Sequence, residues 1–94
     1  MCINLGQKGS RDMRQLIDAL NGLKGKYVNI FTEHKLFGGQ HIRMQFEPET
    51  EIGLGFRCRG QVIYINKNDI IGWNVLRGEI VLRGSMMSIR IVEI

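Results

Sequence analysis

The sequence predicts a mainly β domain with one N-terminal α-helix, folded as a small, strongly bent β-barrel. Apolar residues recur at helical spacing near the N-terminus, and from Lys26 onward they alternate with polar residues in about six short stretches separated by close turns. A helix followed by many short strands favours a barrel or a bent sheet over an alternating βαβ fold. With 94 residues the chain is predicted to be one domain, with a flexible arm over residues 1–9 and the barrel over residues 10–94.

The predicted helix begins at Ser10, a good N-cap residue, and Asp12 in its first turn suits the helix dipole. Its apolar stripe follows the i, i+3, i+4, i+7 spacing through Met13, Leu16, Ile17, Leu20 and Leu23. Gly22 and Gly25 supply the stop. We expect the stripe to be buried as a lid on the β-core.

Two alternating strands follow, over residues 26–33 and 41–46, joined by a loop over residues 34–40 that contains Gly38-Gly39. In the second strand Ile42, Met44 and Phe46 face one way, and His41, Arg43 and Gln45 face the other. Pro48 ends this strand, because proline cannot donate to a β-ladder. The loop aromatic Phe37 would either contact a partner or fold back as a plug on the barrel end.

The next predicted strand covers residues 52–59. Its inner face is formed by Ile52, Leu54, Phe56 and Cys58, and its outer face by Gly53, Gly55, Arg57 and Arg59. The two outward glycines allow either close approach of the backbone or strong curvature.

The run Val62–Ile65 consists of β-formers with no polar face, so we expect it to be covered on both sides. Such a strand fits the centre of a barrel or a subunit interface. It ends in the polar turn Asn66-Lys67-Asn68-Asp69, after which Ile70, Ile71 and Trp73 continue the apolar pattern. The stretches 79–83 and 85–94 form a closing hairpin around Gly84-Ser85. Since an open apolar edge invites pairing with another chain, we expect a homo-oligomer joined through residues 62–65 or the C-terminal strand.

The formal net charge of +4 and the pI near 9.4 favour anionic partners. The chain has two cysteines, Cys2 and Cys58, which make no disulfide framework, and Cys58 is interpreted as a small buried hydrophobe. Reduced cysteines, no signal peptide and no apolar stretch long enough for a bilayer predict a cytoplasmic protein with no membrane partner.

The candidate site is a basic face. If the strands over 41–46 and 52–59 pair as a hairpin, their outward residues His41, Arg43, Arg57 and Arg59 form one patch suited to phosphates. Tyr64, with Tyr27 and Phe31, could stack bases, and Lys67 completes the predicted nucleic-acid-binding set. The alternative is an ordinary solvated polar face.

No catalytic arrangement stands out. The acidic residues Glu47, Glu49 and Glu51 crowd one turn, and the chain has no catalytic triad order, phosphate-cradling loop or dinucleotide fingerprint. His34 and His41 lack a clear third ligand. We therefore expect neither an enzyme, nor a metal site, nor a cofactor.

Three stretches resemble a known family. The segment Leu23–Ile30, which reads LKGKYVNI after a helix, resembles the start of an Sm-like domain, and Cys58–Ile65 and Leu76–Val81 each resemble the second motif of that family. The first of these two is also similar to the final strands of Hfq-type members. This resemblance covers about residues 10–75 and implies a bent barrel, comparable to SH3-like barrels, that assembles into rings and binds RNA.

The sequence thus predicts a self-associating small β-barrel that binds nucleic acid, more specifically RNA, through an arginine-bearing sheet face. Two alternatives from other classes stay open. One is a protein-interaction module, such as a phage or mobile-element inhibitor that docks on a larger protein. The other is a small-ligand-binding oligomer.

Overall fold

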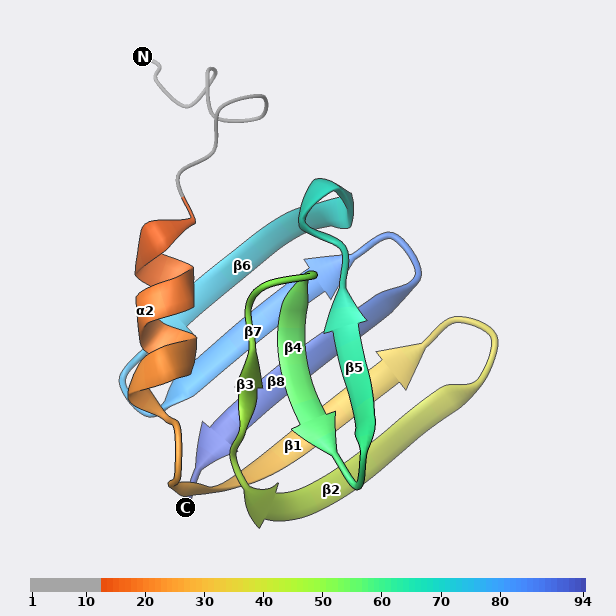
Figure 1. Ribbon diagram of the computed structural model, residues 1–94. Coiled ribbons are helices and arrows are strands. Elements are labelled where there is room, and N and C mark those ends of the chain that lie inside the picture. The colour runs from red at the N-terminus through yellow and green to blue at the C-terminus, as the bar shows by residue number, and fades with distance from the viewer. Residues whose placement is uncertain (1–12) are drawn as a thin grey trace.

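The computed structural model describes residues 13–94, which form one α-helix and eight β-strands (Figure 1). The elements are α2 (Arg14–Gly22), β1 (Tyr27–His34), β2 (Gly38–Gln45), β3 (Pro48–Glu49), β4 (Leu54–Cys58), β5 (Gln61–Ile65), the 3₁₀ turn η1 (Lys67–Asp69), β6 (Ile70–Leu76), β7 (Glu79–Gly84) and β8 (Met87–Glu93). The predicted arm over residues 1–9, the N-cap Ser10 and Asp12 lie outside the described residues. The prediction of a mainly β fold with one helix is confirmed for the described part.

The strands form two antiparallel sheets. Sheet A has the strand order β2-β1-β8-β7-β6, and sheet B has the order β3-β4-β5. The N-terminal strand β1 therefore pairs with the C-terminal strand β8 as well as with its hairpin partner β2. Because each sheet ends in two edge strands within residues 13–94, the predicted closed barrel is not found there.

Sheet B and α2 lie on the same side of sheet A, and the core fills the space between them (Figure 1). Alternation along each strand sends every second side chain into this space. The buried core residues are Leu16, Leu20 and Leu23 of the helix segment, Val28, Ile30, Ile70, Ile80, Leu82, Ile89 and Ile91 of sheet A, Leu54, Phe56 and Ile65 of sheet B, and Phe46. The other face of sheet A carries no described element.

The helix prediction holds where it can be compared. Leu16 and Leu20 are fully buried and Ile17 is partly buried against the core, as expected for a lid. The helix ends before Gly25, whose φ of 82° is a left-handed conformation that glycine adopts easily. Its amide donates to the carbonyl of Phe46 at 2.9 Å, which ties the end of the helix to the end of β2.

The strand over residues 41–46 does not pair with the strand over residues 52–59. β2 begins earlier than predicted, at Gly38, and pairs along its whole length with β1. The strand ends before Pro48 as predicted, but Pro48 itself begins β3 and lies opposite Phe56 of β4. The strands over 41–46 and 52–59 thus belong to different sheets.

Two details of sheet B correct the predictions, and a third decides between two predicted roles. β5 is an edge strand rather than a central one, and it is not covered on both sides, because Tyr64 is exposed and Val62 is half-buried. Ile52 is 57% exposed and precedes β4 instead of lining its inner face. A Cβ atom at Gly53 would lie 2.1 Å from a ring carbon of Tyr64, so of the two roles expected for the outward glycines, close approach is the one observed at Gly53.

The C-terminal hairpin is confirmed, with β7 and β8 paired in register from Glu79–Val92 to Arg83–Ser88. β8 lies in the middle of sheet A, between β1 and β7, so it offers no open edge to another chain. In residues 13–94 no helix is long and apolar enough to span a membrane.

Replacing Leu20 with alanine tests the packing of the helix on the core. The change removes a fully buried side chain and should lower the free energy of unfolding by about 2–5 kcal/mol. Chemical denaturation of the variant measures this loss. Gln15→Ala on the exposed side of the same helix is the control, and equal unfolding curves for the two variants would contradict the packing.

Candidate functional site

The outer face of sheet A, which points away from sheet B and α2, carries three cross-strand rows of side chains. Their order is fixed by the strand register. From β2 to β6 the rows are Arg43, Asn29, Val92, Glu79 and Leu76; then His41, Phe31, Arg90, Val81 and Asn74; then Gly39, Glu33, Ser88, Arg83 and Gly72. This face therefore gathers aromatic, basic and amide groups from strands that are distant in sequence.

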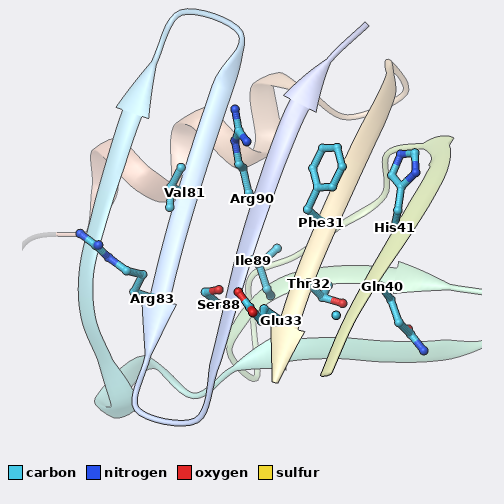
Figure 2. Close-up of a pocket in the computed structure, with 11 residues that line it drawn as sticks. Phe31, Thr32, Glu33, Gln40, His41, Val81, Arg83, Ser88, Ile89 and Arg90 are labelled. Atoms are coloured by element: carbon cyan, nitrogen blue, oxygen red, sulfur yellow. The ribbon is translucent and has the colours of Figure 1, made fainter. Parts of the chain in front are cut away.

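The middle row holds the closest contacts of this face. The rings of Phe31 and His41 are nearly parallel, 7° apart, with centroids 4.7 Å from each other, and Figure 2 shows them side by side on β1 and β2. The guanidinium of Arg90 lies 5.8 Å from the Phe31 centroid on the neighbouring strand, within cation–π range. His41 Nε2 is hydrogen-bonded to Asn29 Oδ1 at 2.9 Å, which fixes the orientation of the imidazole. The side chains of Phe31, His41 and Arg90 form an ordered platform, which we call the Phe31 platform.

The charges on this face are mixed, with a basic excess. Arg90 Nε donates to Glu79 Oε2 at 2.6 Å, so this pair is largely compensated. Within residues 13–94, neither Arg43 nor Arg83 forms an ion pair. An open hollow of about 580 Å³ runs over the platform from Arg83 to His41 (Figure 2). Its walls can offer a ligand both apolar surface and guanidinium groups.

A second hollow of about 410 Å³ lies where edge strand β2 meets the β4–β5 turn. It is lined by Gln40, His41, Ile42, Arg43, Cys58, Arg59, Gln61 and Ile63. Three of the predicted nucleic-acid-binding residues, His41, Arg43 and Arg59, therefore meet in one place even though their strands do not pair. We call this hollow the edge cleft.

The turn that presents Arg59 is strained. Cys58 pairs with Gln61, and the two residues between them both have positive φ angles, 52° at Arg59 and 81° at Gly60, as a type I′ turn requires. Glycine adopts this conformation freely, whereas for a residue with a side chain it is less favourable by about 1–2 kcal/mol. Arg59 is the one non-glycine residue with positive φ in residues 13–94.

Arg57 does not line the edge cleft, because a buried carboxylate holds it elsewhere. Its guanidinium donates to Glu49 Oε1 at 2.7 Å, and the other carboxylate oxygen accepts from the backbone N–H groups of Glu51 and Ile52 at 3.0 and 3.1 Å. The hydrogen bond from Ile52, supported by that from Glu51 and by the Arg57 charge, outweighs burial and holds the pKa of Glu49 below its usual range. This arrangement joins β3 to β4 and explains Arg57 without a ligand.

The last two predicted site residues lie apart from the edge cleft. Tyr64 stands opposite Gly55 on the outer side of sheet B, where its ring covers Gly53. Lys67 lies in η1 between β5 and β6. The structure therefore brings together His41, Arg43 and Arg59, and separates them from Arg57, Tyr64 and Lys67.

The tip of the β1–β2 hairpin is also exposed. Leu36 is 72% and Phe37 82% exposed, so Phe37 does not fold back as a plug. Among the described residues, the one aromatic ring that the Phe37 ring contacts is that of His34, and the two ring centroids are 4.6 Å apart. His34 lies opposite Gly38 and His41 opposite Phe31, so the two histidines do not converge. The described part of the chain contains no group of three His, Cys, Asp or Glu residues that could hold a metal ion.

Comparisons with protein-family models, curated proteins and solved structures find no match to this chain. The interpretation of the site therefore depends on its own contacts and charges.

Sequence reasoning missed two basic residues of the outer face, Arg90 and Arg83. Because Arg90 alternates with Ile89 and Ile91, the pattern predicts that its side chain points away from the core, but it does not predict which residues lie next to it. Phe31 was expected only as one of several possible stacking residues. Its place beside Arg90 follows from the β1–β8 pairing, which no local pattern indicates.

Glu49→Gln tests the buried carboxylate. Because the pKa of Glu49 is lower in the folded than in the unfolded chain, its ionised form contributes stability above the unfolded-state pKa, and this contribution is lost as the pH falls through the folded-state pKa. The variant should melt below the wild type at neutral pH, and the gap should close under acid conditions. Thermal melting across this pH range measures it.

Glu47→Gln, which changes an exposed carboxylate two residues away, is the matched control and should melt like the wild type. A gap between the Glu49 variant and the wild type that is equally large at acid and neutral pH would contradict the role of the charge.

Proposed function

We propose that this chain binds nucleic acid with unpaired bases, RNA in preference, on the outer face of sheet A. The observation that carries the proposal is the Phe31 platform, in which two parallel rings and a guanidinium stand in one row across three strands. A sheet face with aromatic rings and arginines suits bases that stack on the rings while cations face the phosphates. Tyr27, four residues before Phe31 on the same side of β1, adds a further exposed aromatic ring.

The charges of this face support an anionic ligand. Arg43 and Arg83 flank the platform without carboxylate partners in the described residues, so neither has to break an ion pair to meet a phosphate. The preference for RNA comes from the Sm-like resemblance of residues 23–30 and 58–65, which remains a proposal together with the barrel and ring that it implies. Basic groups without partners also predict binding that weakens as salt rises.

Phe31→Ala tests the platform. Loss of one stacking ring should weaken binding of a fluorescent oligouridylate by roughly 5- to 150-fold, which corresponds to about 1–3 kcal/mol. Fluorescence anisotropy at low salt measures the dissociation constant. The fold should persist, because the Phe31 ring lies outside the core and is 40% exposed.

The control is Phe37→Ala, which removes another exposed phenylalanine on the same hairpin but away from the platform. Its affinity should match that of the wild type. A wild type that fails to bind single-stranded RNA or DNA at low salt would refute the proposed function.

The second candidate function is a protein-interaction module. The hairpin tip favours it, since Leu36 and Phe37 are large, adjacent and exposed to solvent. Aromatic and aliphatic side chains of this kind serve as anchors that fill a pocket on a protein partner. Nucleic-acid binding that depends on Phe31 and on salt would favour the first function over this one.

The proposed function also includes self-association of the chain through a strand edge. β5 pairs only with β4 within residues 13–94 and is rich in β-formers, so its other edge is available to a second chain. Light scattering coupled to size exclusion should then give a particle heavier than the 10.8 kDa chain, increasingly so at high concentration. A particle of one chain mass at every concentration would contradict it.

A further inference from the structure

The two hollows of the site adjoin each other at the edge of sheet A, where they share two lining residues. Both are lined by Gln40 and His41, which lie on β2, and β2 has β1 as its only strand partner in the described residues. His41 ends the row of the Phe31 platform and at the same time forms one wall of the edge cleft. A chain molecule lying on the platform therefore reaches the edge cleft directly beyond His41.

We infer that the edge cleft is a phosphate clamp, in which Arg43 from sheet A and Arg59 from sheet B hold the backbone of a single strand whose bases lie on the Phe31 platform. This inference rests on the proposed function and adds to it the path of the ligand. Neither arginine forms an ion pair within residues 13–94, so both guanidiniums can donate to phosphate oxygens. Gln61 and Gln40 in the same cleft add amide donors.

The backbone at Arg59 supports this assignment. The first central position of a type I′ turn favours asparagine, aspartate or glycine, which tolerate positive φ, and an arginine there is costly for the fold. Strained residues persist where the surrounding structure holds them, and they concentrate at functional sites. An arginine at this position gains nothing from a carboxylate in the described residues, whereas a phosphate in the cleft would use its charge.

The clamp selects for single strands. A ligand that stacks bases on the platform and turns over β2 into the cleft must bend its backbone around a sheet edge, with bases free of partners. Bases of a duplex are stacked within the helix and paired, so they are not available to the rings. We therefore expect an oligouridylate to bind and a paired RNA of the same length to bind only through weak charge contacts.

The experiment compares two arginine-to-asparagine variants. Arg59→Asn places a residue that tolerates positive φ before Gly60, so the turn and the fold are kept. Arg77→Asn is the matched control, because Arg77 also precedes a glycine in a two-residue hairpin turn, between the paired Leu76 and Glu79, and lies outside both hollows. Both variants lose one positive charge. The probe is a fluorescent oligouridylate of about ten nucleotides, titrated at several salt concentrations.

Arg59→Asn should weaken binding roughly tenfold and lower the slope of affinity against salt by about 0.7, the value for one phosphate contact to a single strand. Arg77→Asn should leave both close to the wild type, and the Arg59 variant should melt at the same temperature as the wild type or higher. If the two variants lose the same affinity, the clamp is refuted, while a Phe31-dependent interaction still supports the proposed function. If the wild type binds no single strand at low salt, both are refuted.

Discussion

The pairing of the first strand with the last is the interaction on which the rest of the structure depends. It joins residues 28–34 to residues 87–93 and therefore closes a loop of more than half the chain, at a cost in chain entropy that local hairpins do not pay. The inner side of this ladder puts Ile30 against Ile91, both fully buried, and its outer side puts Phe31 beside Arg90. Core and site are thus two faces of one ladder, and the platform cannot form unless the core does.

What the sequence predicted well is local. The helix stripe, the strand β1 and the closing hairpin all show periods that a few residues define, and Leu16, Leu20, Ile80 and Ile89 are buried as those periods indicate. What it could not predict is which strands become neighbours. Alternation placed Arg43 and Arg59 on outward faces, but the hairpin assumed between their strands does not exist, and they meet in the edge cleft because sheet B packs over sheet A.

Sheet B shows why period alone misjudged β5. An all-apolar run suggests that other elements pack on both faces of the strand. Instead, the ring of Tyr64 packs against the backbone of Gly53, which is a much smaller contact. At Gly55 an added Cβ would lie 1.9 Å from the backbone carbonyl oxygen of Ile63, so both outward glycines serve the approach of β5. An aromatic ring lying over a glycine covers apolar area without a second layer, so the strand can remain at the edge of its sheet.

Arg57 and Arg59 are the same residue type and were predicted to lie on the same face, yet they have different roles in the structure. Arg57 lies within the β-ladder, and its guanidinium donates to the buried carboxylate of Glu49 at 2.7 Å, a shorter hydrogen bond than those from Glu51 and Ile52. Arg59, two residues later, lies in the turn and forms no ion pair with a carboxylate within the described residues. Its positive φ angle lowers the stability of the fold. The first arginine is explained by the fold. The second is a cost to the fold, and the proposed clamp would account for it through a phosphate held between Arg59 and Arg43.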